Sequence, residues 1–361
     1  MGVPSRRLRI EQGVIRIDAS YGEGGGQIAR TACALSALTG IACELTRIRA
    51  GRSKPGLRPQ HCAAVRGLAK LCGASFSPPL KPGLEELVFS PGSLSAKDLT
   101  LDTGTAGSVG LVLQGLLIAG VGLDRPVRIL LRGGTDVPFA PPADYVRSVL
   151  APLLGRMGYR VDVSILRRGY YPKGGGVVDV HIRPPEIPLL KPLEIPESTE
   201  ASCCFGVSHA AQALSERNVA ERQRKRAQRK LTDFLHVPAK ISEEYGSSNS
   251  LGSGIVVWIE TRESILGASA LGETGKSAEE VAEEAAERLF RTYHSRASLD
   301  PWMGDQILPY LALSDGPSTV SVPNLTRHMQ SNIWVLERFL NVRFRTEEAA
   351  THVRVRCEPE A

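Results

Sequence analysis

Several kinds of segment are missing from this chain of 361 residues, and each absence excludes a class of protein. No apolar run approaches the ~20 residues that a transmembrane helix requires. The basic start of the chain, residues 1–12, lacks the apolar core of a secretory signal. We therefore expect a soluble, cytoplasmic protein with no membrane partner.

Aromatic residues and metal-binding cysteine pairs are also scarce. Aromatics make up 5% of the chain and hydrophobic residues 42%, so we expect a core built mainly from Ala, Val, Leu and Ile. The seven cysteines include no C-x-x-C pair and no Cys/His spacing typical of zinc sites. Most of them are expected to be small buried side chains in a reducing compartment.

Two common catalytic motifs are absent as well. The chain contains neither G-x-x-x-x-G-K-[ST] nor G-x-S-x-G. Phosphate binding of the Walker type and a hydrolase nucleophile elbow are thereby excluded. The formal net charge of +6 suits a polyanionic partner, but many basic proteins bind no nucleic acid.

One local pattern recurs along the chain: an apolar helix ends near Gly or Asn, and a strand follows. Three of these helices stop at Gly40, Gly73 and Gly158, where a left-handed C-cap residue is favoured. The pattern predicts an α/β chain made of several βα-type units, each packing helices on one face of a sheet. The four copies span residues 33–48, 64–77, 146–166 and 332–344.

A long segment of different composition separates the third and fourth copies. A proline-rich stretch, residues 183–196, is predicted to be an extended edge or a linker. A strand at 254–261 and an acidic helix at 277–293 come later. We predict a small inserted α/β domain over these elements. The predicted boundaries are 196–297 for this domain, and 1–195 with 298–361 for the main domain.

The insert begins with a strongly basic helix, predicted from about Leu214 to Leu235. Its cations could contact RNA, or they could form a solvated face with i,i+4 partners, and we favour the solvated face. The cations are Arg217, Arg222, Arg224, Lys225, Arg226, Arg229 and Lys230.

The segment from Tyr21 to Gln27, YGEGGGQ, is the strongest single signal for chemistry. Glycine lets a ligand approach the main chain closely, and the apolar helix expected after it offers free N–H groups and a positive dipole end. Phosphate would fit there, with Glu23 available to hold a hard cation such as Mg²⁺. The alternative is an ordinary glycine-rich turn between a strand and a helix.

Further polar clusters lie outside the insert. If Gln27 opens the helix, Arg30 lies one turn further on nearly the same face. The basic loop from Arg49 to His61 could hold phosphates with Arg side chains or be an ordinary surface loop.

A lone histidine such as His328 is more often structural, but its neutral imidazole can act as nucleophile or base. The other clusters are residues 102–108 with Gln114, 132–144 and 302–306.

Taken together, these segments resemble the RNA 3′-terminal phosphate cyclases. Each motif alone is weak, but their order and spacing cover almost the whole chain, and the insert matches least. The matching run comprises EGGGQ (23–27), IRAGRxKPGL (48–57), Gln60-His61, GTAGS (104–108), GGTDxPxAPPAD (133–144), RRGYYPKGGGVV (167–178), Asp305-Gln306, His328 and ERFLxVRF (337–344).

The resemblance implies an α+β fold of repeated βαβαββ-like units in a pseudo-threefold arrangement, with a smaller inserted α/β domain. Enolpyruvyl transferases share this unit, so fold alone does not decide function. The implied partners are ATP and RNA with a 3′-terminal phosphate. The oligomeric state stays open, a homodimer included.

The implied reaction is an ATP-dependent ligase-class step in RNA processing that makes a 2′,3′-cyclic phosphate. His328 would be adenylylated and then pass AMP to the RNA 3′-phosphate, with Arg30 and Arg52 neutralising phosphate oxygens. Glu23 would hold Mg²⁺ or Mn²⁺. The nucleotide-binding positions would be Gln27, Arg49, Gln60, Gln114, Pro141, Trp302, Met303, Gly304, Asp305 and Gln306. Trp302 stands where the family often has tyrosine, and an indole can also stack on adenine.

Two alternatives remain. A non-catalytic cyclase-like protein of ribosome assembly would be expected to lose the histidine and the charged glycine-rich loop, and this chain keeps Glu23, Arg30, Arg52 and His328. An enolpyruvyl transferase of related fold is opposed by the full order of motifs.

Overall fold

Three stretches of the chain repeat one order of elements, β-α-β-α-β-β, in the computed structural model, which describes residues 13–187 and 189–360. The first unit consists of β1 (Ile15–Asp18), α1 (Gly26–Thr39), β2 (Cys43–Thr46), α2 (Pro59–Cys72), β3 (Ser75–Ser77) and β4 (Leu87–Ser90). The second consists of β5 (Leu99–Asp102), α3 (Val109–Gly120), β6 (Val127–Gly133), a helical segment, β7 (Arg160–Arg167) and β8 (Gly176–Arg183). That helical segment comprises α4 (Ala143–Tyr145), a π-helical turn (Val146–Leu150) and α5 (Ala151–Arg156).

The third unit is interrupted after its first strand. It consists of β9 (Glu194–Ile195), α8 (Pro301–Ala312), β14 (Ser318–Val322), α9 (Arg327–Phe339), β15 (Val342–Glu348) and β16 (Val353–Pro359). The proline-rich stretch expected to be an edge or a linker contains β9, which is the edge strand of this sheet.

All three units have the same sheet topology. The strand orders are β1-β2-β4-β3, β5-β6-β8-β7 and β9-β14-β16-β15. In each sheet the first two strands are parallel and the other pairings are antiparallel. The predicted α+β fold of repeated units is therefore confirmed.

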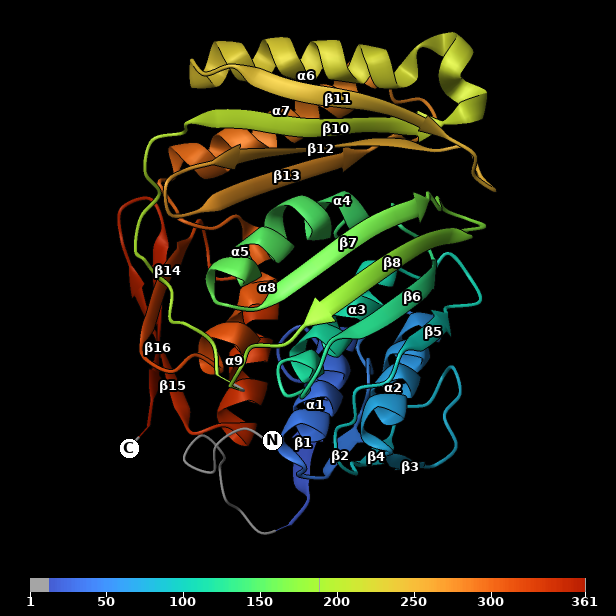
Figure 1. Cartoon of the computed structure of the whole chain (residues 1–361), viewed down its shortest axis with the longest axis vertical. Helices are drawn as coiled ribbons and strands as arrows, with labels where there is room; N and C mark the ends of the chain where they lie inside the picture. Colours follow the sequence, from blue (N-terminus) through green and yellow to red (C-terminus); the bar gives the residue numbers. More distant parts are fainter. Residues whose placement is uncertain (1–12, 188, 361) are drawn as a thin grey trace.

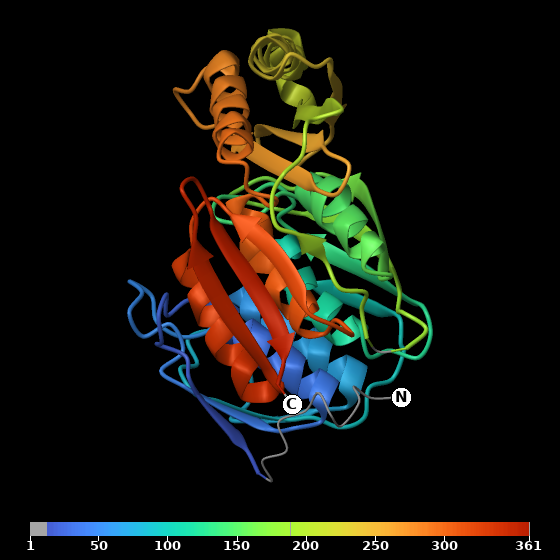
Figure 2. The ribbon, with the colours of Figure 1, turned by 90° about the vertical axis from the view of Figure 1, so that its left-hand side faces the viewer.

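The sheets lie on the outside of the molecule and the helices lie between them (Figures 1 and 2). Helix α1 packs against α2, α3 and α9, so helices from different units share one interior. Strands such as β5 and β7 alternate buried and exposed residues, as expected for sheets with one solvated face. The shared core is largely aliphatic, as the composition predicted.

Glycine ends the helices of the first unit as predicted. Gly40 and Gly73 are C-caps in the left-handed region, with φ of 75° and 62°. Their N–H groups donate to the carbonyls of Ser36 and Ala69. Gly158, with φ of 86°, stands one residue beyond the C-cap of α5. Only glycine occupies this region without a steric cost.

The segment between β9 and α8 forms a fourth sheet with a different topology. It contains β10 (Cys203–Ala211), a 3-10 helix (Gln212–Arg217), α6 (Val219–Leu235), β11 (Ala239–Gly246), β12 (Ser253–Glu260), β13 (Ile265–Leu271) and α7 (Ala278–His294). The strand order is β11-β10-β12-β13, and α6 and α7 cover one face (Figure 1). We refer to residues 203–294 as the insert. Its separate core supports the proposed division at 196–297, which remains a prediction.

The basic helix of the insert starts later than predicted. Asn218 has a left-handed backbone with φ of 50°, so it separates the 3-10 helix from α6, which begins at Val219 rather than Leu214. The cations of α6 also find partners mostly across the helix pair rather than at i,i+4. Arg222, Arg226 and Lys230 pair with Glu279, Glu283 and Glu287 of α7, and Lys225 pairs with Glu221.

Two further expectations can be compared with the structure. All seven cysteines lie in the described part of the chain, no disulfide joins any of them, and six are buried. Among the described residues, no helix is long and apolar enough to cross a membrane.

Candidate active site

A cavity of about 1630 Å³ lies between the repeated units and the insert. It collects most of the residues singled out from the sequence. Those lining it are Glu23, Gln27, Arg30, Arg49, Arg52, Gln60, Gln114, Pro141, Trp302, Asp305, Gln306 and His328. Met303 and Gly304 do not line it: Met303 is fully buried, and Gly304 packs against Val322 and Met329.

The glycine-rich loop before α1 is held by close packing on both sides. A Cβ atom at Gly26 would lie 2.1 Å from Nε2 of His61, so only glycine fits between this loop and α2. On the other side, the backbone N–H of Glu23 donates to Oγ of Ser331 in α9, at 3.1 Å. Gly25 is the N-cap of α1 and contributes no side chain, so the first N–H groups of the helix can reach a ligand.

His328 is the second residue of α9, a helix capped by the side chain of Thr326. Its imidazole lies at the glycine-rich loop: a Cβ atom at Gly25 would be 3.6 Å from Cε1 of His328 and 3.5 Å from Nη2 of Arg52. Burial, with the charges of Arg30 and Arg52, lowers the pKa of His328 below its ordinary value. The imidazole is therefore neutral at pH 7, and its buried Nδ1 has no hydrogen-bond partner among the described residues.

Arg30 is a buried cation without a matching anion. It is only 5% exposed and makes no ion pair with any described residue. Its Nη2 donates to Oε1 of Gln114 at 3.2 Å, while Nε has no partner. Burial lowers the pKa of Arg30 to about 10, so the side chain is still charged at pH 7. Such a group is suited to an anionic ligand, because burying an unpaired charge is costly.

The basic loop from Arg49 to His61 adds positive charge to the same side of the cavity. Arg49 donates to the carbonyls of Lys54 and Gly56, at 2.7 and 2.8 Å, and so holds the loop in shape. Burial lowers the pKa of His61 well below its ordinary value, and Arg30, Arg49 and Arg58 add to this effect. His61 and Arg58 were missed as site residues, although His61 belongs to a motif that matched the family.

Gln60 connects this loop to the second glycine-rich loop. Its Oε1 accepts a hydrogen bond from the backbone N–H of Ser108, the N-cap of α3, at 3.0 Å. Gln114 lies on α3 and holds Arg30. The two amides therefore position neighbouring elements as well as lining the cavity.

The start of α8 forms another wall. Asp300 caps this helix by accepting from the N–H groups of Trp302 and Met303, both at 3.0 Å. The carbonyl of Asp305 accepts from Nε2 of Gln27 at 3.2 Å, which ties α8 to α1. Burial raises the pKa of the Asp305 carboxyl to about 7, and Thr326 donates a hydrogen bond to it. Trp302 meets Tyr145 edge-on, with ring centroids 5.5 Å apart.

Comparison with known proteins identifies the family. The family model described as RNA 3'-terminal phosphate cyclase matches residues 21–346. The chain belongs to this family. A protein of Methanopyrus kandleri named RNA 3'-terminal phosphate cyclase is 45% identical over 335 residues, which cover 91% of this chain and 94% of the relative. A protein of the same name from Caldivirga maquilingensis is 45% identical over 353 residues, covering 96% and 98%.

The glycine-rich loop of this RNA 3'-terminal phosphate cyclase family member also holds the carboxylate suggested for a metal. Glu23 forms an ion pair with Arg52 through Oε1. Its Oε2 makes no hydrogen bond with any described residue.

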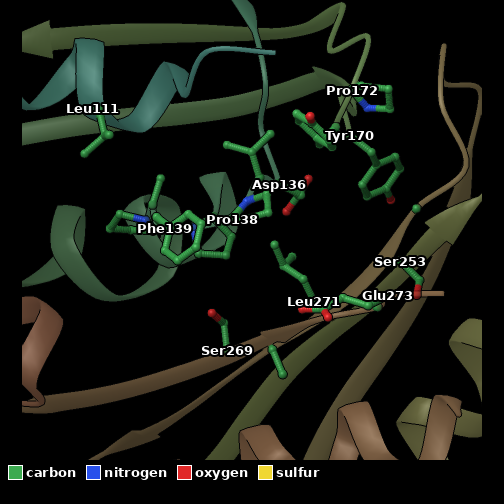
Figure 3. Close-up of a pocket in the computed structure, with 18 of the residues that line it drawn as sticks. Leu111, Asp136, Pro138, Phe139, Tyr170, Pro172, Ser253, Ser269, Leu271 and Glu273 are labelled. Atoms are coloured by element: carbon green, nitrogen blue, oxygen red, sulfur yellow. The ribbon is translucent and has the colours of Figure 1, made fainter. Parts of the chain in front are cut away.

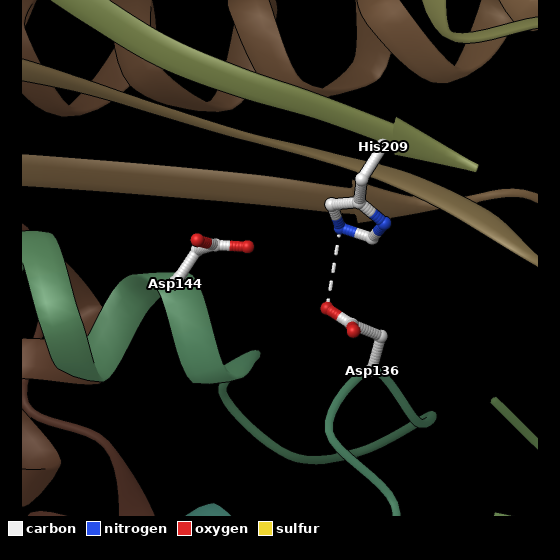
Figure 4. Close-up of side chains that lie close together, drawn as sticks. All are labelled: Asp136, Asp144 and His209. Carbon is white, nitrogen blue, oxygen red and sulfur yellow. Dashed lines mark ion pairs between the residues drawn. The ribbon is translucent and has the colours of Figure 1, made fainter. Parts of the chain in front are cut away.

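A different cluster, Asp136, Asp144 and His209, brings potential metal ligands within 4.8 Å of one another (Figure 4). It lies between the second unit and strand β10. Arg168 already occupies both carboxylates, with Nη1 at 2.6 Å from Asp144 and 3.4 Å from Asp136. His209 Nε2 is 3.2 Å from Asp136 Oδ1. This distance is short enough for an ion pair, but the two atoms do not form a hydrogen bond with each other. With the guanidinium in place, the cluster is an ionic connection rather than a metal centre.

The insert provides the remaining wall of the cavity. In Figure 3, Ser269 and Leu271 of β13 stand across the cavity from Pro138 and Phe139, which follow β6. Sequence motifs could not reveal this wall, because the insert matched the family least. For the facing wall, a possible signal was present in the sequence: Phe139 stands between Pro138 and Pro141.

Proposed function

We propose that this protein converts the 3′-terminal phosphate of RNA into a 2′,3′-cyclic phosphodiester in an ATP-dependent reaction. The names of the relatives support this reaction. The single observation that carries it is the meeting of a neutral imidazole, a guanidinium and a glycine-rich helix start, at His328, Arg52 and Gly25. This arrangement combines a nucleophile with groups that neutralise phosphate charge.

In the first proposed step, an imidazole nitrogen of His328 attacks the α-phosphorus of ATP. A nitrogen–phosphorus bond forms, the bond between the α-phosphorus and its bridging oxygen breaks, and pyrophosphate leaves. The lowered pKa of His328 suits this role, because a protonated imidazole has no free electron pair. Arg30 and Arg52 would neutralise the charge that develops on the phosphate oxygens.

The next two steps use the adenylate as a leaving group. An oxygen of the RNA 3′-phosphate attacks the phosphorus on His328, the nitrogen–phosphorus bond breaks, and an RNA–adenylate anhydride forms. The ribose 2′-hydroxyl then attacks the phosphorus of the RNA, loses its proton, and expels AMP. Splitting the reaction in this way replaces the poor leaving group of a phosphate monoester.

The residues present fit a nucleoside triphosphate. Arg30 is buried without an anion, and Oε1 of Gln27 and Nδ1 of His328 are buried without hydrogen-bond partners in the described chain. Trp302 and Pro141 line the same cavity and would contact the adenine. A divalent cation, Mg²⁺ or Mn²⁺, would neutralise the triphosphate, and Glu23 would hold it. Because Oε1 of Glu23 already contacts Arg52, we expect Oε2 to bind the cation.

Labelling with α-³²P-ATP and Mg²⁺ tests the mechanism. We expect a protein–AMP adduct that is labile in acid and stable in base, and we expect His328→Ala to abolish it. His181→Ala is the matched control, because His181 lies outside the cavity and should label as the natural protein does. Normal labelling of His328→Ala would place the nucleophile elsewhere.

A second measurement separates an enzyme from a non-catalytic binding protein. RNA with a 3′-phosphate is incubated with ATP, and its end group is analysed for a 2′,3′-cyclic phosphate. Absence of product with correctly folded protein would overturn the proposed function.

Glu23→Ala is expected to weaken the dependence of labelling on the divalent cation, and an unchanged response would remove Glu23 from the metal site.

A further inference from the structure

Phe139 is an exposed aromatic residue in a costly backbone conformation. Its exposure is 104% of the reference value, so its side chain contacts almost nothing in the protein. Its φ is 62°, in the left-handed region that bulky residues avoid. Pro138 on one side, and Pro141 and Pro142 on the other, restrict the segment that holds it there. A strained residue that stabilises no core points to a function outside folding.

The ring of Phe139 lies in the cavity rather than on an outer surface. Figure 3 shows it beside Pro138 and opposite Ser269 and Leu271 of the insert. The cavity, at about 1630 Å³, is larger than the ~300–1,000 Å³ typical of a site for one small molecule. There is therefore room for a second substrate beside a nucleotide.

The walls near the insert carry cations that form no ion pair with any described residue. Lys173, in the turn between β7 and β8, and Arg217, at the end of the 3-10 helix, are exposed and line the cavity. Neither forms an ion pair within the described parts of the chain. Other cations of this wall differ, since Arg222 pairs with Glu279 and Arg288 with Glu284. Tyr171, which is 67% exposed, adds a second aromatic ring beside Lys173.

We propose that the last nucleotides of the RNA cross this part of the cavity as a single strand. A base stacks on Phe139, and Lys173 and Arg217 contact the phosphates. This inference rests on the proposed function and adds the path of the RNA to it. Aromatic faces stack on any base, and exposed cations follow the backbone, so the surface would bind single strands with little sequence preference.

The stacking test compares stability with RNA affinity. Phe139→Gly relieves the left-handed strain, so its melting temperature should be equal to or higher than that of the natural protein. Its affinity for a fluorescent RNA of about eight nucleotides with a 3′-phosphate should fall about tenfold or more, as measured by anisotropy. Phe139→Trp should retain the affinity. Leu166→Ala is the control, because Leu166 is 60% exposed but outside the cavity.

Each outcome decides between stated possibilities. Equal RNA affinity of Phe139→Gly and the natural protein would overturn the inference. A raised KM for ATP in self-adenylation, with RNA affinity unchanged, would assign Phe139 to the adenine and overturn it as well. Failure of the proposed function is seen separately, as absence of cyclic product from the natural protein, because the anisotropy measurement needs no turnover.

The phosphate contacts have their own signature. Removing one phosphate contact should reduce the slope of log affinity against log salt by ~0.7 for a single strand. We expect this reduction for Lys173→Ala and for Arg217→Ala. Arg291→Ala removes an exposed cation of α7 outside the cavity and should leave the slope unchanged. Equal slopes for all three variants would remove Lys173 and Arg217 from the RNA path.

Discussion

Two arginines of this protein are almost equally buried but have opposite surroundings. Arg30 is 5% exposed and Arg168 is 6% exposed. Arg168 contacts Asp136, Asp144 and Glu244, whereas Arg30 has no carboxylate partner in the described chain. Burial lowers the pKa of Arg30 to about 10. Burial opposes the charge of Arg168 too, but the two aspartates outweigh it and raise its pKa.

The carboxylate partners of the two arginines suggest different roles: Arg168 stabilises the fold, whereas we propose that Arg30 binds a ligand. Arg168 completes a network within the folded chain, and this network joins the second unit to the insert through Asp136 and His209. Arg30 has no such counter-charge in the described chain, and we propose that an anionic ligand supplies it. Similar burial therefore has different consequences, and the missing counter-charge is our reason for proposing Arg30 as an active-site residue.

The largest expected effect is on Arg168. Arg168→Met leaves Asp136 and Asp144 buried without their cation, which should lower the free energy of unfolding by about 3–5 kcal/mol. Denaturant unfolding followed by circular dichroism measures this loss. Arg183→Met is the control, because Arg183 forms an exposed pair with Asp162 and should have a small effect. Similar losses for the two variants would remove the distinction between the network and a surface pair.

The matching change at Arg30 should have the reverse outcome. Arg30→Met removes an uncompensated charge, so the melting temperature without ATP should stay the same or rise. Self-adenylation should fall about 100-fold or more, because a preorganised phosphate ligand is lost. Natural protein should be stabilised by added ATP, and Arg30→Met should lose most of this shift. A strongly destabilised Arg30→Met with normal ATP stabilisation would contradict the comparison.

Local signals made most of the fold predictable. Gly40 and Gly73 mark helix ends because their left-handed conformation depends on neighbouring residues alone. The start of α6 was predicted too early, because Asn218 can also adopt this conformation and the charge pattern continues through it. The glycine-rich loops indicated the site because they stand directly before α1 and α3.

Interactions between distant segments were not predictable in this way. The partners of Arg168 lie 24 to 76 residues away in sequence, so no spacing rule reveals its network. The block predicted at 302–306 lies at the cavity, but not every residue of it lines the cavity. In a helix, consecutive side chains point in different directions, so Trp302 and Gln306 line the cavity whereas Met303 lies beneath it.

The same comparison can be made between two buried carboxylates, for which we expect a smaller effect on stability. Asp136 has cations beside it and a lowered pKa despite its burial, whereas burial raises the pKa of Asp305 to about 7. An unfolded aspartate loses its proton near pH 4. Between these values the folded state binds more protons, so the free energy of unfolding falls as pH rises, and levels off above about pH 7.

Asp305→Asn should remove most of this dependence. We expect the variant to be more stable than the natural protein at pH 8, with little difference at pH 4. Thermal melts at the two values measure the change. Part of the slope should remain, because burial also raises the pKa of Asp300 to about 6. An identical pH profile for both proteins would show that Asp305 is ionised throughout.

The smallest effect is expected for the charges between α6 and α7. Arg226 and Glu283 are each about one-third exposed, so Glu283→Gln should cost only ~0.5 kcal/mol or less, and the cost should shrink further at high salt. Arg226→Glu should also leave RNA affinity unchanged, since Arg226 already pairs with Glu283. Arg217, on the same strongly basic segment but unpaired, should behave differently. If reversing Arg226 weakened RNA binding as much as removing Arg217, then pairing within the folded chain would not identify the cations available to a ligand.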